Sequence, residues 1–278
     1  MGDTTNGHGA NGGTKKKEAI DVESVTIRFA GDSGDGMQLT GDRFTTASAI
    51  AGNDLRTFPD YPAEIRAPIG TLAGVSAFQI NFSSADVHTP GDVLDVLVAM
   101  NPAAMKANIA DLKRGGVLIA NTDNFTEKNF QKADIESNPL EDEVLKNKYQ
   151  IFEVPITSLT RNGLAELDLQ SNLADRCKNF FALGLMFWMY SRPMEPTIEW
   201  ISQKFASRTE VIAANTRALE AGYYYGENAE LMANQYKVHE ATYPEGKYRN
   251  ISGNVAVAYG FIAATKKMGL KLFWGAYP

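Results

Sequence analysis

The segment Val25-Thr26-Ile27-Arg28-Phe29-Ala30-Gly31-Asp32-Ser33-Gly34-Asp35-Gly36 joins an apolar run to a glycine-rich turn. Residues 25–29 predict a β-strand, and the spacing of the apolar residues after the turn predicts a helix over 38–51. Glycine lets the backbone adopt positive φ and approach a ligand closely, and the N-terminus of a helix attracts anions. The segment therefore predicts a phosphate-handling corner of an α/β fold.

The spacing of these glycines differs from that of the common nucleotide-binding motifs. A dinucleotide-binding turn needs G-x-G-x-x-G and an acidic residue at the end of the second strand, but the predicted strand at 54–58 ends without a carboxylate. No Lys-Ser or Lys-Thr pair follows the glycines, which excludes a P-loop. Gly34-Asp35-Gly36 is similar to the Gly-Asp-Gly of a thiamine diphosphate site, but positions 61–66 lack the Asn that such a site requires. Two interpretations stay open: a phosphate-binding turn, and a turn that only packs a helix onto a strand.

Composition and charge narrow the classes of function. The chain has 278 residues, 44% of them hydrophobic, which is enough for one large or two ordinary domains. A net charge of −6 argues against nucleic acid or an anionic membrane surface as the main partner. The apolar run over 180–190 is too short to span a bilayer, which takes about 20 residues, so it predicts a buried core or interface helix. With no signal peptide recognisable in residues 1–22, we expect a cytoplasmic protein with no membrane partner.

Cysteine and histidine offer little for metal or redox chemistry. Cys177 is the only cysteine, so the chain alone can form no disulfide and hold no four-cysteine iron–sulfur cluster. It precedes an apolar helix with no nearby histidine, which favours a buried structural thiol over a nucleophile. The three histidines show no ligand spacing, and we expect no metal site.

Strand and helix patterns alternate between residues 25 and 154, which is typical of a parallel α/β sheet. The buried strand at 93–100 leads to Asn101 as a helix cap and Pro102 at the first helical position, and Gly115-Gly116 is predicted to end this helix. The alternating segment 75–82 predicts a half-exposed, antiparallel strand at the sheet edge. Further strands are predicted at 117–120, 149–154 and 270–274, and helices at 174–190, 197–205, 208–225 and from Gly253 onward.

We therefore predict an α/β fold with three layers. Its core is a mostly parallel, doubly wound (Rossmann-like) sheet with a helical C-terminal extension, followed by the beginning of a second α/β domain. The expected boundaries are a disordered tail over 1–22, a Rossmann-like domain over 23–205, a helix and linker over 206–248, and a truncated second domain over 249–278.

Several longer strings carry a resemblance to a known family. They are Gly31 to Met37, the loop from Thr57 to Arg66, the strand end from Asp95 to Asn101, Asn138-Pro139-Leu140, Asp175-Arg176-Cys177-Lys178-Asn179, Gly253-Asn254, and the terminal Trp274-Gly275-Ala276-Tyr277-Pro278. Together they resemble the 2-oxoacid:ferredoxin oxidoreductases, and in particular the alpha subunit of the 2-oxoglutarate branch. In that subunit a gamma domain precedes a pyrimidine-binding-type domain, and the resemblance covers about residues 23–278.

The resemblance implies a chain that works as part of a complex. Such enzymes convert 2-oxoglutarate and coenzyme A to succinyl-CoA and reduce ferredoxin. Thiamine diphosphate, Mg²⁺ and a [4Fe-4S] cluster lie mainly on the beta subunit, and the assembly is a dimer of alpha–beta heterodimers. The gamma domain either braces the subunit interface or closes over coenzyme A, and the resemblance leaves both roles open.

The residues implied as coenzyme A contacts lie in two loops. The first is the glycine turn with Gly31, Asp32, Ser33, Gly34, Asp35, Gly36 and Met37, and the second contributes Glu64 and Arg66. Arg66 is suited to pairing with a phosphate, although a surface ion pair explains it equally well. Asp32 and Asp35 are predicted to cap the helix or to accept hydrogen bonds from the pantetheine amides.

One departure from the family concerns the end of the sequence. The resemblance places Tyr277 and Pro278 at the strand end near the substrate, but the Ile-Thr-Pro that carries the family's carboxylate contact does not follow them. We therefore expect no catalytic residue in this chain and no activity from it alone. The competing interpretations are a free-standing nucleotide- or coenzyme A-binding module and, less in keeping with the motifs, an NAD(P)-dependent reductase.

Overall fold

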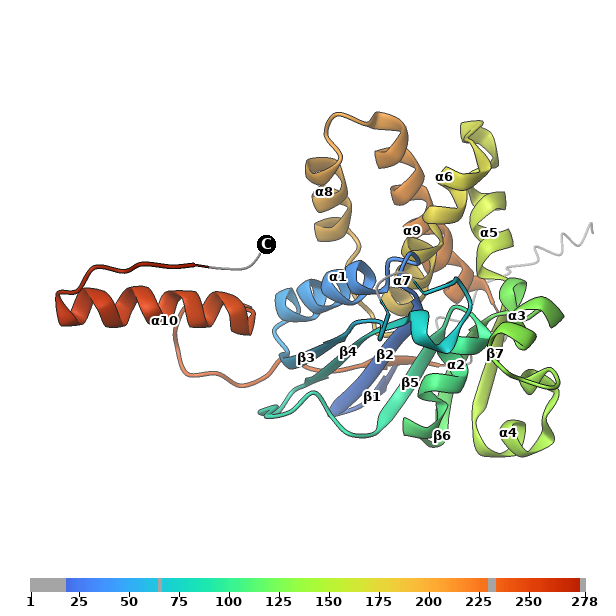
Figure 1. The fold of residues 1–278 in the computed structure, drawn as a ribbon, viewed down its shortest axis with the longest axis horizontal. Helices are drawn as coiled ribbons and strands as arrows, with labels where there is room; N and C mark the ends of the chain where they lie inside the picture. Colours follow the sequence, from blue (N-terminus) through green and yellow to red (C-terminus); the bar gives the residue numbers. More distant parts are fainter. Residues whose placement is uncertain (1–18, 65–66, 230–233, 276–278) are drawn as a thin grey trace, which may run out of the picture. The chain divides into compact units, whose positions relative to one another are not determined.

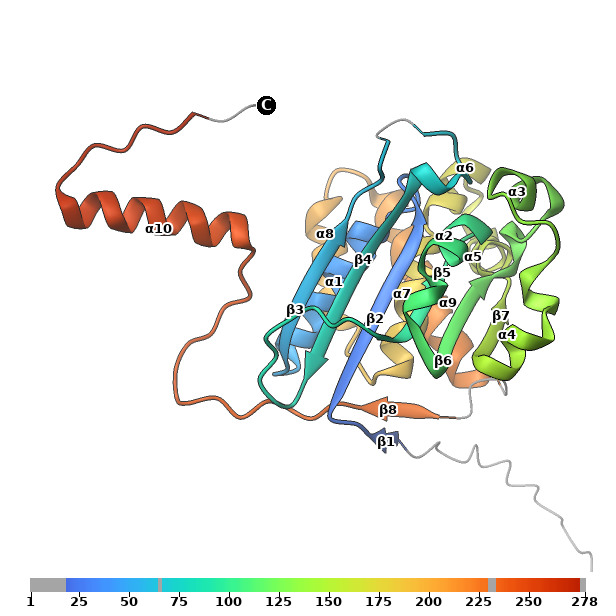
Figure 2. The ribbon, with the colours of Figure 1, turned by 60° about the horizontal axis from the view of Figure 1, so that its bottom comes forward.

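The computed structural model describes residues 19–64, 67–229 and 234–275. It divides into two compact units, residues 1–241 and 242–278. In the first unit, a sheet of six strands has the order β3-β4-β2-β5-β6-β7 among the described residues (Figures 1 and 2). The strands are β2 (Ser24–Asp32), β3 (Asp54–Asp60), β4 (Val75–Ser83), β5 (Leu94–Ala99), β6 (Leu112–Asn121) and β7 (Gln150–Val154).

Strands β2, β5, β6 and β7 run parallel, whereas β4 is antiparallel to both of its neighbours, β2 and β3. The sheet is therefore mixed and mostly parallel, as the alternation of strand and helix patterns predicts. A separate two-stranded parallel sheet pairs β1 (Ala19–Asp21) with β8 (Gln235–Lys237). This pairing brings the two ends of the first unit together.

Helices cover both faces of the sheet, which makes the three predicted layers (Figure 1). A hydrophobic core lies on each face of the sheet, and alternate residues of a strand point into the two cores. Val96 and Val98 of β5 pack in one core, and Leu97 packs in the other. The helices that the site and the cores use are α1 (Met37–Ile50), α2 (Pro102–Asn108), α4 (Glu143–Lys148), α5 (Ile156–Gly163), α6 (Ser171–Arg176), α7 (Lys178–Met189), α8 (Glu195–Lys204) and α9 (Thr209–Asn228).

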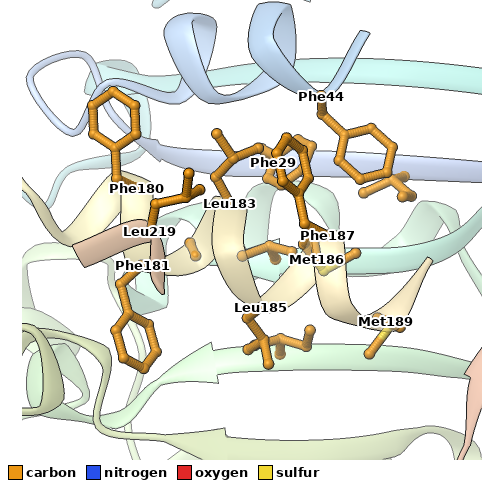
Figure 3. Packing of buried hydrophobic residues seen from close by; sticks show 14 of the residues in the cluster. Phe29, Phe44, Phe180, Phe181, Leu183, Leu185, Met186, Phe187, Met189 and Leu219 are labelled. Carbon is orange, nitrogen blue, oxygen red and sulfur yellow. The ribbon is translucent and has the colours of Figure 1, made fainter. Parts of the chain in front are cut away.

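Helix α7 is apolar all round and is buried on all sides, as expected for a helix of this kind. Figure 3 shows its side chains in the larger core, where the Phe187 ring lies 5.9 Å from the Phe44 ring of α1. On its other side α7 packs against α9 so closely that Gly184 faces the carbonyl oxygen of Leu219. The prediction of a buried core helix at 180–190 is confirmed, although a break at Cys177 divides the longer predicted helix into α6 and α7.

Strand β4 differs from its prediction. It is antiparallel as expected, but it is an internal strand and not an edge strand, because β3 pairs with its outer side. Its polar residue Gln79 is buried, because Arg28 donates to its Oε1 atom and its Nε2 atom donates to the carbonyl oxygens of Pro90 and Gly91. The alternation of polar and apolar residues in this strand therefore reflects a satisfied polar pair, not exposure to solvent.

The prediction for the region after β5 is correct at its beginning and wrong at its end. Asn101 caps α2, accepting a hydrogen bond of 2.8 Å from the N–H of Ala104, and Pro102 is the first helical residue. The helix ends at Asn108, however, and Gly115-Gly116 lies inside β6, where a Cβ at Gly116 would lie 3.1 Å from the Asp95 carbonyl oxygen. Gly116 permits a close approach of β6 to β5, whereas Gly115 has open space around it and a positive φ of 74° that favours glycine. Neither residue ends a helix.

The second unit contains α10 (Gly253–Met268), in which Ser252 is the N-cap and Gly269 ends the helix with positive φ. The strand expected at 270–274 is absent from the described part of this unit, and these residues have no regular secondary structure. A strand needs a neighbouring strand for its backbone hydrogen bonds, and no described residue of this unit supplies one.

Candidate functional site

The glycine turn lies at the carboxyl end of β2, where the order of the strands reverses. The chain leaves β2 through α1 on one face of the sheet and leaves β5 through α2 on the other face. In open α/β sheets, ligands bind outside the carboxyl ends of the strands at such a switch point. The predicted strand, glycine turn and helix are therefore present, with Gly31 and Asp32 still inside the strand.

Gly31 is required by the closeness of its neighbours. A Cβ at this position would lie 2.9 Å from Oδ2 of Asp35 and 3.2 Å from the Cβ of Met100. Met100 in turn donates its N–H to the carbonyl oxygen of Ala30, which ties the end of β5 to the turn. The turn is thus packed against the neighbouring parallel strand end.

The two aspartates hold the turn together and do not cap α1. Asp35 Oδ2 accepts a hydrogen bond of 3.0 Å from the N–H of Asp32, and its Oδ1 lies 2.7 Å from Nζ of Lys178. Asp32 Oδ1 accepts from the N–H of Gly70 at 2.9 Å. No side chain of the described residues caps α1, so the predicted capping role is wrong. The reason is geometric, since the carboxylates point back toward the strand and toward residue 70.

Burial raises the pKa of Asp32 above its ordinary value of 3.8, and the nearby Asp35 carboxylate adds to that rise. The hydrogen bond from Gly70 and the more distant charges of Lys178 and Lys132 act in the opposite direction without cancelling it. Lys178 therefore has two effects at this turn: it neutralises Asp35 and reduces the negative charge that a phosphate would meet.

Gly36 places the turn directly beside α7. It is the N-cap of α1 with φ 77° and ψ 22°, and a Cβ there would lie 2.6 Å from Nδ2 of Asn179. Because no side chain caps α1, its first N–H groups point out of the helix without an intrahelical acceptor. These donors and the helix dipole make this end of α1 suited to an anionic group.

Two buried amide atoms beside the turn have no hydrogen-bond partner in the described parts of the chain: Oδ1 of Asn179 and Nδ2 of Asn101. Asn179 contacts Gly36, and Asn101 follows Met100 at the end of β5. Unpartnered buried polar atoms are uncommon and call for an explanation. A ligand with polar groups at the switch point would supply one.

The remaining residues predicted to contact coenzyme A or to lie near the substrate are only partly brought close to the glycine turn. The side chain of Met37 is buried in the core, so only its backbone can reach a ligand. Glu64 is exposed, and its N–H donates to the carbonyl oxygen of Ala73. Arg66, Tyr277 and Pro278 lie outside the described residues.

The sequence alone indicates no role for Lys178, Asn179 or Gly70 at this turn. The only available signal was a charged and a polar residue placed immediately before the apolar residues of α7. Their partners in the turn are far away in sequence, so the pattern of α7 alone could not reveal the contact. Lys132 also holds the second loop, because its Nζ donates to the carbonyl oxygen of Ile69 at 2.9 Å.

Cys177 immediately precedes Lys178 in the chain. The thiol is buried, donates to the carbonyl oxygen of Leu173, and has a pKa raised by burial to about 11. The prediction of a structural thiol is confirmed. Within the described residues, no group of three or more His, Cys, Asp and Glu side chains could hold a metal ion. Nor does any described helix have the length and apolar character that crossing a membrane requires.

Comparison with known proteins agrees with this architecture. Residues 26–225 match the family described as pyruvate ferredoxin/flavodoxin oxidoreductase. The chain is 52% identical over 257 residues to the 2-oxoglutarate oxidoreductase subunit KorA of Mycobacterium tuberculosis, covering 92% of this chain and 39% of that protein. It therefore spans about two fifths of the length of this relative.

Two solved structures show the same fold. The 2-oxoglutarate:ferredoxin oxidoreductase from Magnetococcus marinus, solved with 2-oxoglutarate, coenzyme A and succinyl-CoA bound, matches with a TM-score of 0.63 and 23% identity, covering 91% of this chain and 43% of that one. The gamma subunit of a keto/oxoacid ferredoxin oxidoreductase from Geobacter sulfurreducens matches with a TM-score of 0.50 and 22% identity, covering 74% and 99%. Because the family match extends over more than half of its residues, the chain belongs to the pyruvate ferredoxin/flavodoxin oxidoreductase family.

Proposed function

We propose that this chain forms the N-terminal part of the alpha subunit of a 2-oxoglutarate:ferredoxin oxidoreductase. The observation that carries the proposal is the 52% identity over 257 residues to a 2-oxoglutarate oxidoreductase subunit. In the proposed reaction the bond between C1 and C2 of 2-oxoglutarate breaks and CO₂ leaves. The remaining acyl group is transferred to the sulfur of coenzyme A, and two electrons pass to ferredoxin.

The described residues do not fit a site for thiamine diphosphate and Mg²⁺. Asp35 is the only carboxylate in Gly34-Asp35-Gly36, and Lys178 and the N–H of Asp32 already occupy it. The chain's only thiol is buried and protonated, and one cysteine cannot hold a [4Fe-4S] cluster. We infer that a beta subunit carries these groups, and that ferredoxin accepts electrons from that subunit.

For this chain we propose a role in binding coenzyme A at the glycine turn. The open N–H groups at the start of α1 suit a phosphate, and the pairing of Lys178 with Asp35 lowers the repulsion that two carboxylates would cause. The unpartnered amides of Asn179 and Asn101 offer a donor and an acceptor to the polar groups of a pantetheine chain.

We further propose that the loop after β3 closes over coenzyme A, in the manner of an active-site lid. The glycine turn and this loop are joined by the hydrogen bond from Gly70 to Asp32, so a ligand at the turn can influence the loop. Arg66 is the residue of the loop best suited to a phosphate, because its guanidinium can make two parallel hydrogen bonds to phosphate oxygens.

The test of gating compares two arginine variants in the complete enzyme complex. Arg66→Ala should raise the Michaelis constant for coenzyme A about tenfold and leave that for 2-oxoglutarate nearly unchanged, since a charge-assisted contact is lost. Arg114→Ala, a control at an exposed position near the other end of the sheet, should change neither constant. Equal effects of Arg66→Ala on both constants would refute gating.

A second candidate function is a binding module without catalysis of its own. It is favoured by the lack, among the described residues, of any group of three or more His, Cys, Asp and Glu side chains that could hold a metal ion. Titration of intrinsic fluorescence separates both of these functions, the oxidoreductase subunit and the binding module, from an NAD(P)-dependent reductase. Saturable binding of coenzyme A but not of NADH supports the subunit or the module, and tight binding of NADH supports a reductase. Turnover of 2-oxoglutarate by the assembled complex then supports the oxidoreductase subunit, and a lack of turnover supports the binding module.

The assembly and its location stay predictions. We expect a dimer of alpha–beta heterodimers in the cytoplasm. The mass of the native complex, measured under conditions that keep subunits together, tests the assembly, and a mass equal to that of a single alpha chain would contradict it.

A further inference from the structure

A second polar site lies at the opposite end of the sheet from the glycine turn. A pocket of about 480 Å³ is lined by the end of α7, the residue after α1 and the segment that follows β8. Asn53 precedes β3 at the end of the sheet where β2 begins, so the pocket and the glycine turn are separated by the length of β2, about 25 Å.

Arg192 reaches this pocket from the end of α7. Ser191 adopts a left-handed conformation with φ 53°, and the N–H of Arg192 then bonds back to the carbonyl oxygen of Phe187 at 2.8 Å. This helix ending turns the arginine side chain inward, where only 4% of the residue is exposed. The guanidinium lies 4.9 Å above the ring of Phe82.

Among the described residues, the buried guanidinium has a neutral hydrogen-bond partner and no charged one. Its Nη2 atom donates to Oδ1 of Asn53 at 2.6 Å, and its Nε atom is buried without an acceptor. No carboxylate of the described residues lies within ion-pair distance of Arg192, and burial lowers the pKa of this group to about 10. Burying a charge without a counter-ion is unfavourable, because the charge loses its hydration without gaining an opposite charge.

The rim of the pocket carries a lysine and a histidine. Lys237 and His239 line it together with Glu240, the acidic residue among the described lining residues. Lys237 is exposed and has no ion pair within the described residues, whereas His239 faces Asp21 at 2.9 Å. Asn53 connects the rim to the floor, since its Nδ2 donates to the carbonyl oxygen of His239 while its Oδ1 accepts from Arg192.

We propose that this pocket binds a small oxyanion, a carboxylate or a phosphate group, between Arg192 at its floor and Lys237 and His239 at its rim. The bound anion supplies the counter-charge that Arg192 lacks. Because Asn53 and the pocket hold the segment 237–240 against the rest of the first unit, binding also stabilises the attachment of that segment. The site is separate from the proposed contact with coenzyme A and does not depend on it.

The test is calorimetric titration of the full 278-residue chain with inorganic phosphate and with succinate, at an ionic strength held constant with chloride. At least one oxyanion should bind saturably, and the stronger of the two identifies the group that the pocket prefers. Lys237→Gln should weaken that binding roughly fivefold, as expected for loss of a partly exposed charged contact. Lys128→Gln, an exposed lysine on a short helix of the first unit, is the matched control and should leave the affinity unchanged.

Saturating coenzyme A separates this pocket from the glycine turn, and the oxyanion should still bind in its presence. The proposal is overturned if neither oxyanion binds beyond the effect of chloride, if Lys128→Gln weakens binding as much as Lys237→Gln, or if coenzyme A abolishes binding. Because Lys237 is exposed, its substitution should not unfold the chain, and circular dichroism of the variant checks this.

Discussion

The contact between α7 and α9 allows a direct prediction of stability from the structure. A Cβ added to Gly184 would lie 1.9 Å from the carbonyl oxygen of Leu219 and 2.9 Å from the backbone nitrogen of Tyr223. A Cβ added to Gly222 on the other helix would likewise lie 1.9 Å from the carbonyl oxygen of Phe181. Since ordinary contacts need about 3.5 Å, Gly184→Ala forces the two helices apart by about 1.5 Å.

Two opposing effects determine how much Gly184→Ala changes the free energy of unfolding. Alanine has a higher helix propensity than glycine, which stabilises the variant by about 1 kcal/mol. The neighbouring atoms at Gly184 belong to backbone and cannot rotate away, so overpacking costs about 3 kcal/mol or more. The net loss of about 2 kcal/mol corresponds to a decrease in Tm of roughly 4–8 °C for a unit of this size.

The assay is thermal unfolding followed by circular dichroism, with Gly34→Ala as the control. Gly34 has no atom within 4 Å of an added Cβ, so its substitution should change the stability by less than about 0.5 kcal/mol. If Gly184→Ala is as stable as the wild type, or gains stability from its helix propensity, the inferred closeness of α7 and α9 is refuted.

Two further predictions concern the glycine turn and the neighbouring Cys177, and a third concerns the activity of the chain alone. Burial raises the pKa of Asp32, so the folded state binds a proton at this carboxylate more tightly than the unfolded chain does. Above the folded pKa the ionised carboxylate therefore lowers the free energy of unfolding. This destabilisation disappears as the pH falls toward 3.8, the ordinary pKa of the group. Asp32→Asn should therefore stabilise the protein more at pH 7 than at pH 4 in urea unfolding, and an advantage that is larger at pH 4 would contradict the sign. Cys177, with a thiol pKa of about 11, should resist an aromatic disulfide reagent at pH 8 until the chain unfolds, and labelling of the native protein within seconds would show that the thiol is accessible. The chain alone should not reduce a viologen dye with 2-oxoglutarate and coenzyme A, and reduction by the purified chain would disprove the need for a partner.

The sequence permits a good prediction of the α/β corner because the signals there are local. The apolar run of β2, the glycines after it, and Asn101-Pro102 after β5 each determine the structure of their own neighbourhood. Helix α7 is equally predictable, since a helix that is apolar all round has to be buried on every side.

The errors arise where distant residues decide the outcome. Strand β4 is internal because β3 pairs with its outer side, and Gln79 can be buried there because Arg28, 51 positions away, donates to its amide oxygen. Asp35 pairs with Lys178, which no local pattern around the turn could indicate. Gly115-Gly116 was interpreted as a helix end, but the short α2 and the early start of β6 place it in a strand. In each case tertiary contacts override local preference.

We propose that the chain serves coenzyme A-dependent oxidation of 2-oxoglutarate as part of a larger enzyme. The most direct measurement isolates the native complex through this chain and follows viologen reduction with 2-oxoglutarate, with and without coenzyme A, while succinyl-CoA is quantified. We expect viologen reduction that requires both 2-oxoglutarate and coenzyme A, with succinyl-CoA formed in proportion to the electrons transferred. Reduction that is independent of coenzyme A, or no reduction with 2-oxoglutarate by the intact complex, would contradict it.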